Sequence, residues 1–206
     1  NWTEVELSFI GTYKRLIASD QGKFIALATN ENRFSFSETG ENWQTGTLPF
    51  LAAWEDGIYA DDQFVIIASD TSDLLTSPDG VTWTTRNIGD DVGGDESSIS
   101  QWSHITYGKG KFLAVSANDR ATATSTDGIN WTRHDEVLKD LIGDGQADWD
   151  IVGVEYGDNR FIVLDTTGRN QYSFDGITWY DGETVSGTIT WNKLLYRQGV
   201  FLALGT

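Results

Sequence analysis

The eight residues "STDGINWT", at positions 125–132, decide the fold because the same motif returns three more times. It reappears as "TSPDGVTWT" at 76–84, as "SFDGITW" at 173–179 and, less closely, as "SETGENW" at 37–43. Asp and Ser side chains bond nearby backbone N–H groups, and Gly tolerates the positive φ of a tight turn. We therefore predict that this turn motif is a structural device, in which the Trp covers a hairpin with apolar surface.

The turn motif has the pattern Ser-x-Asp-Gly-x-x-Trp, and Thr39 stands in place of the aspartate in the first copy. Its members are Ser37, Gly40, Trp43, Ser77, Asp79, Gly80, Trp83, Ser125, Asp127, Gly128, Trp131, Ser173, Asp175, Gly176 and Trp179. It belongs to a longer repeat, in which a phenylalanine opens an apolar run such as "FVIIA". These residues, spaced 40, 48, 49 and 40 apart, are Phe24, Phe64, Phe112, Phe161 and Phe201. A Tyr stands five residues before four of them, and Ser19 takes that place in the first repeat.

Each repeat predicts four short strands, which are clearest in the third as "WSHITYG", "KFLAVSA", "ATATSTDG" and "INWTRHD". The second strand is apolar at successive positions, which is typical of a strand covered on both faces. Four-stranded antiparallel sheets that repeat in this way predict an all-β protein, a β-propeller in which each sheet is one blade. The blades are predicted at 13–48, 53–88, 102–137, 151–184 and 190–206, with residues 1–8 closing the last. This gives five blades in a single domain, 1–206. A fragment of a larger ring would give the same pattern, and we expect the chain to be part of a longer one.

The turn motif resembles the Asp-box, or BNR-type, repeat of sialidases and many non-catalytic propellers. The longer pattern, from Trp through "YGKGKF" to the turn motif, resembles propeller modules of phage tail or receptor-binding proteins and bacterial surface proteins. That resemblance implies an extracellular or virion-surface location. The commonest Asp-box has one residue between Asp and Gly, whereas here they are adjacent. Sialidases also carry an early Arg-Ile-Pro motif, and the only prolines here are Pro49 and Pro78, so the resemblance extends to the turn and not to a catalytic site.

Composition excludes several classes of function. Acidic residues outnumber basic ones 31 to 14, giving a net charge of −17, and such a surface repels nucleic acids and anionic membranes. The chain has no cysteine, so disulfides and Cys-based metal sites are excluded. No apolar run approaches ~18 residues, so we expect no membrane insertion.

Ligand binding is predicted where the repeat is interrupted. Two blade-to-blade connections, 89–101 and 138–150, are enlarged and reach the same rim as the loops between second and third strands. An indole ring covers the apolar face of a sugar, and short polar side chains bond its hydroxyl groups. The candidate ligand-binding residues are Trp149, Trp102, Asn118, Asp119, Arg120, Arg169 and Asn170. For Trp102 the alternative is a core position, because Trp54 and Trp191 share its place in the repeat.

The acidic loop 138–150 also suggests a calcium site, since carboxylates are hard oxygen ligands. The candidate metal ligands are Asp140, Asp144, Asp148 and Asp150. No other cofactor is implied. His104 and His134 have neither metal-ligand nor triad spacing, so we interpret both as sheet residues.

Together these features favour a binding module over an enzyme. The prediction is an adhesin or receptor-binding propeller that recognises a cell-surface glycan or a protein receptor. Homo-oligomerisation or assembly into a fibre would raise its avidity. Two alternatives remain open: a sialidase-like glycoside hydrolase, which needs two suitably spaced carboxylates, and a structural propeller that binds a protein partner.

Overall fold

The computed structural model describes residues 4–89, 101–117, 119–139, 150–185 and 189–206, and within them every regular element is a β-strand. The first sheet contains β1 (Tyr13–Ala18), β2 (Phe24–Ala28), β3 (Glu31–Ser37) and β4 (Gln44–Ala52). The second contains β5 (Trp54–Ala60), β6 (Gln63–Ala68), β7 (Asp73–Ser77) and β8 (Thr84–Asn87). The third contains β9 (Trp102–Gly108), β10 (Lys111–Ser116), β11 (Thr122–Ser125) and β12 (Thr132–His134). The fourth contains β13 (Ile151–Gly157), β14 (Arg160–Asp165), β15 (Asn170–Ser173) and β16 (Trp179–Asp181), and the fifth contains β17 (Trp191–Arg197) and β18 (Val200–Gly205).

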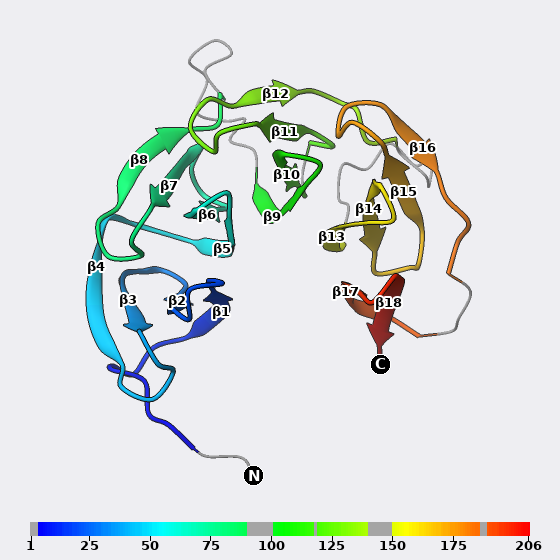
Figure 1. The fold of residues 1–206 in the computed structure, drawn as a ribbon. Helices are drawn as coiled ribbons and strands as arrows, with labels where there is room; N and C mark the ends of the chain where they lie inside the picture. The colour runs from blue at the N-terminus through cyan, green and yellow to red at the C-terminus, as the bar shows by residue number, and fades with distance from the viewer. Residues whose placement is uncertain (1–3, 90–100, 118, 140–149, 186–188) are drawn as a thin grey trace.

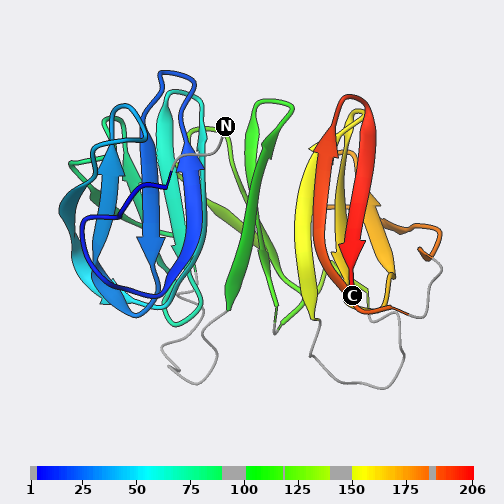
Figure 2. The same ribbon diagram turned by 90° about the horizontal axis from the view of Figure 1, so that it is seen from below.

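The five sheets stand side by side around a common axis, with the first strand of each sheet innermost (Figure 1). Seen at a right angle to this view, the strands run roughly along the axis (Figure 2). Each complete sheet is an antiparallel meander, which confirms the predicted four-stranded sheets. Second strands such as β6 and β10 are buried on both faces, as their continuous apolar sequence predicts. Within the described residues no helix could span a membrane.

The hydrophobic core lies between neighbouring sheets rather than along the axis. Phe34 of the first sheet and Phe64 of the second both pack against Trp83, at ring-centroid distances of 5.7 and 6.4 Å. Trp131 and Trp179 lie in the corresponding clusters of the next two interfaces. The Trp of the turn motif therefore joins its own sheet to the one before it.

The turn motif forms the hydrogen bonds that the sequence predicts. In the second sheet the Gly80 N–H donates to Ser77 Oγ (2.8 Å), and the N–H groups of Val81 and Thr82 donate to Asp79 Oδ1 (2.8 and 2.7 Å). Gly80 has a φ of 71°. Burial raises the pKa of the Asp79 carboxyl, but the Thr82 and Val81 N–H groups outweigh it and lower that pKa to about 2.

The same turn also links neighbouring sheets. In the first three sheets, the residue directly before the strand-opening Phe donates a side-chain hydrogen bond to the carbonyl of the Asp in the next sheet's turn motif. These bonds run from Lys23 Nζ to Asp79 O, from Gln63 Nε2 to Asp127 O (2.8 Å) and from Lys111 Nζ to Asp175 O (3.0 Å). Three successive interfaces therefore repeat one polar contact at the same place.

Two details differ from the sequence reading. Ala18, not Ser19, pairs with Phe24, because the turn between β1 and β2 is one residue longer than in the other sheets. Among the described residues the fifth sheet contains only two strands, and residues 4–8, predicted as part of its closing strand, lie beside the first sheet instead. The Ser8 hydroxyl holds them there through hydrogen bonds with the Ser35 hydroxyl (2.8 Å) and the Thr45 hydroxyl (2.9 Å). The count of five blades stays a prediction.

Candidate functional site

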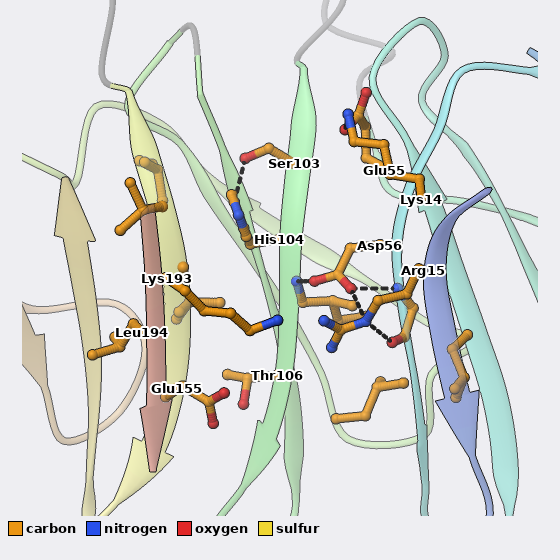
Figure 3. A pocket seen from close by; sticks show the side chains of 18 of the residues that line it. Lys14, Arg15, Glu55, Asp56, Ser103, His104, Thr106, Glu155, Lys193 and Leu194 are labelled. Carbon is orange, nitrogen blue, oxygen red and sulfur yellow. Dashed lines mark hydrogen bonds and ion pairs between the residues drawn. The ribbon is translucent and has the colours of Figure 1, made fainter. Parts of the chain in front are cut away.

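A cavity of about 740 Å³ lies along the axis, between the first strands of all five sheets. Its lining comes from β1, β5, β9, β13 and β17 and contains charged groups of both signs (Figure 3). This cavity has the size of a small-molecule or peptide-segment site. We take it as the candidate functional site and call it the axial cavity.

One register position supplies four of its ionisable groups. Arg15, Asp56, His104, Gly153 and Lys193 pair with the residue three places after the strand-opening Phe in their respective sheets. In every sheet the register shifts immediately before this position, which marks a β-bulge or a similar irregularity. Bulges re-aim side chains, so one local device repeated five times brings these five positions to the axial cavity. We call them the axial ring.

Arg15 and the buried Asp56 form an ion pair within the axial ring. Arg15 Nε lies 2.7 Å from Asp56 Oδ1. The N–H groups of Gly57 and Ile105 donate to the two carboxylate oxygens of Asp56, at 2.8 and 3.1 Å. Burial raises the pKa of Asp56, and the Arg15 guanidinium and both N–H groups oppose that rise. The pair thus ties the first, second and third sheets together at the cavity wall.

His104 is partly buried, and its Nδ1 lies 2.9 Å from the hydroxyl oxygen of Ser103. Burial lowers the pKa of the imidazole to about 4, and the positive charges of Arg15, Lys14 and Lys193 contribute to that depression. The ring is therefore neutral at pH 7. Arg15, Lys14 and Lys193 all lie close enough to His104 to disfavour a positive charge on its ring.

Lys193 is the member of the axial ring whose positive charge could bind a ligand. Its side chain extends into the axial cavity (Figure 3), and its ammonium has neither a hydrogen bond nor an ion pair among the described residues. Lys14, by contrast, is paired with Glu55. Glu155, on β13, lines the cavity nearby, and burial raises the pKa of its carboxyl. A ligand in the axial cavity would meet a free ammonium donor beside a carboxyl group.

The rim residues predicted to bind ligand are engaged with the protein itself. Trp102 is 1% exposed and packs in the core between the second and third sheets, so its ring has no free face for a sugar. Asp119 accepts a hydrogen bond from Arg133 (2.7 Å), and Arg120, beside it, has a φ of 58°. Arg169 pairs with Asp165 and Asn170 donates to the carbonyl of Glu183, both at the rim of the fourth sheet. Asn118 and Trp149 lie outside the described residues.

The predicted calcium ligands are mostly outside the described residues as well, namely Asp140, Asp144 and Asp148. Asp150 is described, and its backbone carbonyl accepts a hydrogen bond from Thr166 N–H (2.9 Å). In the part of the chain that the structure describes, no group of three or more His, Asp or Glu side chains could hold a metal ion. The calcium site stays a prediction.

The axial ring lies within the regular part of each repeat, so the interruptions of the repeat do not indicate it. Aligning the repeats on their Tyr would have placed Asp56, His104, Gly153 and Lys193 in one column, three residues earlier. Arg15 would still have been displaced, because the longer turn of the first sheet shifts it by one residue. In an alignment of the repeats, a position occupied by chemically different residues would therefore have indicated the axial ring.

No protein-family model and no curated protein sequence matches the chain. Several solved structures resemble its fold. A catalytically inactive virginiamycin B lyase from Staphylococcus aureus, solved with quinupristin, is similar over 98% of this chain and 72% of its own, with a TM-score of 0.75 and 12% identity. YCF48 from Cyanidioschyzon merolae is similar over 96% of this chain and 64% of its own, with a TM-score of 0.69 and 16% identity. A chain of a nidogen/laminin complex is similar over 94% of this chain and 72% of its own, with a TM-score of 0.67 and 12% identity.

The chain therefore has a β-propeller fold, as predicted. Identities this low show the fold alone, and they do not extend to the Asp-box class or to a phage or surface origin. The chain spans less than two thirds of the YCF48 chain. YCF48 has also been solved bound to a D1 peptide.

Proposed function

We propose that this propeller is a non-catalytic binding module, which takes a carboxylate-bearing segment of a polypeptide partner into the axial cavity. The observation that carries the proposal is the unpaired Lys193 ammonium in the axial ring, beside the already neutralised Arg15–Asp56 pair. An ammonium without a counter-ion gains from an anionic partner, because charge-assisted hydrogen bonds are stronger than neutral ones.

Electrostatics supports the same class of ligand. The chain as a whole carries a net charge of −17, yet the charged side chains that line the axial cavity include four cationic and three acidic ones. They are Lys14, Arg15, Lys193 and Arg197, and Glu55, Asp56 and Glu155. The acidic surface repels anions, whereas the excess of cationic side chains in the axial cavity attracts them. This contrast favours binding of an anionic ligand at the cavity over other parts of the surface. The Glu155 carboxyl then selects for a segment that also offers a donor.

A polypeptide partner also fits the propellers of similar fold, which include one solved with a peptide and one solved in a protein complex. The lyase among them leaves an enzymatic role as the alternative. In the axial cavity, however, Glu55 and Asp56 are ion-paired with Lys14 and Arg15, which leaves fewer carboxylates for acid–base work. The glycan adhesin, its location on a virion or cell surface and its assembly into oligomers stay predictions.

The test is a calorimetric titration of the protein with an oligo-glutamate peptide and an oligo-lysine peptide. At physiological salt the net charge is screened beyond about 8 Å, so contacts inside the cavity dominate. We expect saturable binding of oligo-glutamate alone and a loss of about tenfold in affinity for Lys193→Ala. The matched control is Lys109→Ala, since Lys109 lies in the turn between β9 and β10 and does not line the axial cavity.

Equal affinity for both peptides, or an unchanged affinity in Lys193→Ala, would refute the proposal. The same protein is titrated with an acidic polysaccharide while reducing ends are assayed. Binding of the polysaccharide but of neither peptide would show that the ligand is a glycan. Release of reducing ends would show that the protein is a hydrolase and not a binding module.

A further inference from the structure

Three charged side chains on β13 and β17 line the axial cavity without a partner of opposite charge. Lys193 and Arg197 belong to β17, and Glu155 belongs to β13. No ion pair joins any of them to another of the described residues. Arg197 Nη1 donates to the backbone carbonyl of Tyr196 (2.7 Å), which leaves the charge of the guanidinium without a counter-ion. We call Lys193, Glu155 and Arg197 the charged row.

The charges across the cavity, on β1 and β5, are paired instead (Figure 1). Lys14 forms an ion pair with Glu55, and Arg15 forms one with Asp56. A charge that already has a partner attracts a ligand less strongly than an unpaired charge does, because the partner's field opposes its own. The charged row is therefore the part of the lining where charged groups of a ligand gain most.

Lys193 and Arg197 lie on one face of β17. The strand pairs with β18 in an unbroken register from Lys193 to Arg197, and an interval of four residues returns the side chain to the same face. At a rise of about 3.3 Å per residue, their Cα atoms are about 13 Å apart. An extended peptide has the same rise, so two of its residues four positions apart match this spacing.

Glu155 lies level with the midpoint between the two cations of the row. Two glycines of β13 define its alignment with β17. A Cβ added to Gly153 would lie 3.1 Å from Leu194 Cβ, and one added to Gly157 would lie 2.3 Å from the Tyr196 ring. β13 therefore runs alongside β17 in the same direction. Because Glu155 is halfway between the two glycines, it lies beside the middle of the β17 segment.

Glu155 and Arg197 are the only charged residues at their positions in the repeat. Two residues after the axial ring, the other sheets have Ile17, Ile58, Thr106 and Leu195. Four residues after it, they have Ser19, Ala60, Gly108 and Gly157. The scaffold therefore requires no charge at either position, and both exceptions occur on the neighbouring strands β13 and β17.

The charges of the row are close enough to influence one another. Burial raises the pKa of the Glu155 carboxyl, and the positive charges of Arg197, Arg15 and Lys193 oppose that rise. A purely anionic ligand that reaches both cations of the row therefore also meets a like charge at Glu155. A ligand with a positive group between two anionic groups meets an opposite charge at all three positions.

We propose that the charged row recognises an extended peptide in which two acidic residues, four positions apart, flank a basic residue at the midpoint. This inference rests on the proposed function of the axial cavity and specifies its ligand. Side chains at every second residue of an extended chain lie on one face, so the acidic, basic and acidic groups face Lys193, Glu155 and Arg197 in turn. The pattern is the same in both chain directions, so either orientation of the peptide fits the row.

The experiment titrates the whole 206-residue chain calorimetrically with two pentapeptides of identical composition, blocked at both ends. One has the sequence Glu-Ser-Lys-Ser-Glu, and the other has the rearranged sequence Glu-Glu-Ser-Ser-Lys. Both carry the same net charge, so any difference between them comes from the order of the charges. We expect saturable binding of the first peptide and at least about tenfold weaker binding of the second.

Two protein variants test the individual contacts. Arg197→Ala should weaken binding of the first peptide by about tenfold, whereas its matched control Arg86→Ala, on β8 and outside the cavity lining, should not. Glu155→Gln keeps the shape of the side chain and removes its charge. Replacement of the peptide's Lys by Ser should weaken binding about tenfold in the natural chain and leave it unchanged in Glu155→Gln.

The outcomes separate this inference from the proposed function. Equal binding of the two pentapeptides, an unchanged affinity in Arg197→Ala, or the same response to the Lys-to-Ser change in Glu155→Gln would each overturn the charged row as a recognition site. If oligo-glutamate still binds through Lys193 in that case, the proposed function of the axial cavity stands. If neither pentapeptide nor oligo-glutamate binds, both proposals are wrong.

Discussion

The neutral His104 predicts that acid destabilises this protein well before its carboxylates titrate. Burial and the charges of Arg15, Lys14 and Lys193 lower the pKa of the imidazole from 6.5 to about 4. Between these two values the unfolded chain binds a proton that the folded chain does not. Stability is therefore fully present above the unfolded pKa and is lost as the pH falls toward the folded one.

The loss can be calculated from these two pKa values. For a single group with pKa values of 6.5 and about 4, the free energy of unfolding falls by about 2 kcal/mol between about pH 7 and about pH 4.5. The turn-motif aspartates change the free energy of unfolding only at lower pH, since Asp79 and Asp175 have a pKa of about 2. Burial raises the pKa of the Asp56 carboxyl and of the partly buried Glu155 carboxyl, so their contribution to stability changes with pH in the opposite direction.

The measurement is urea unfolding followed by tryptophan fluorescence at several pH values in this window. The variant His104→Gln keeps a polar side chain but cannot titrate, so the difference between the two proteins isolates His104. His134→Gln is the control, because His134, whose pKa is also lowered, bonds Thr124 away from the axial cavity. Parallel pH profiles for the natural chain and His104→Gln would refute the electrostatic description of the axial cavity.

Three further predictions concern the fold. Ser77→Ala removes the acceptor for Gly80 N–H and should lower the free energy of unfolding by about 1–2 kcal/mol, whereas Thr85→Ala, at an exposed position in β8, should change it little. Gly108→Ala would place a Cβ 1.9 Å from the Tyr156 ring, so we expect a loss of about 1–3 kcal/mol that shrinks in the Tyr156→Ala background. Trp83→Ala should cost about 3–5 kcal/mol and Trp43→Ala less, because Trp43 is only half-buried. Urea unfolding measures all three, and equal effects within a pair would contradict the assigned role.

Much of the fold was predictable because each repeat solves the same packing problem. The turn-motif bonds, the Trp between sheets and the doubly covered second strands all follow from residue types at fixed spacing. The position of residues 4–8 could not be predicted, because it depends on the Ser8 and Ser35 hydroxyls, which the repeat pattern does not include. The predicted position of Ser19 is wrong for a similar reason: one extra turn residue changes the pairing between β1 and β2 without changing the motif, so Ala18 pairs with Phe24.

The candidate site was harder to predict, and the reason lies in how a repeat protein divides its residues. Positions that hold neighbouring sheets together must stay alike from one repeat to the next, because every interface makes the same contacts. The axial-ring position is free of that demand, because its residues line the axial cavity and make no contact that every interface repeats. It can therefore hold Arg15, Asp56, His104, Gly153 and Lys193 in turn without loss of the fold. A search for repeated motifs finds the scaffold, whereas function is to be sought at equivalent positions whose residues differ.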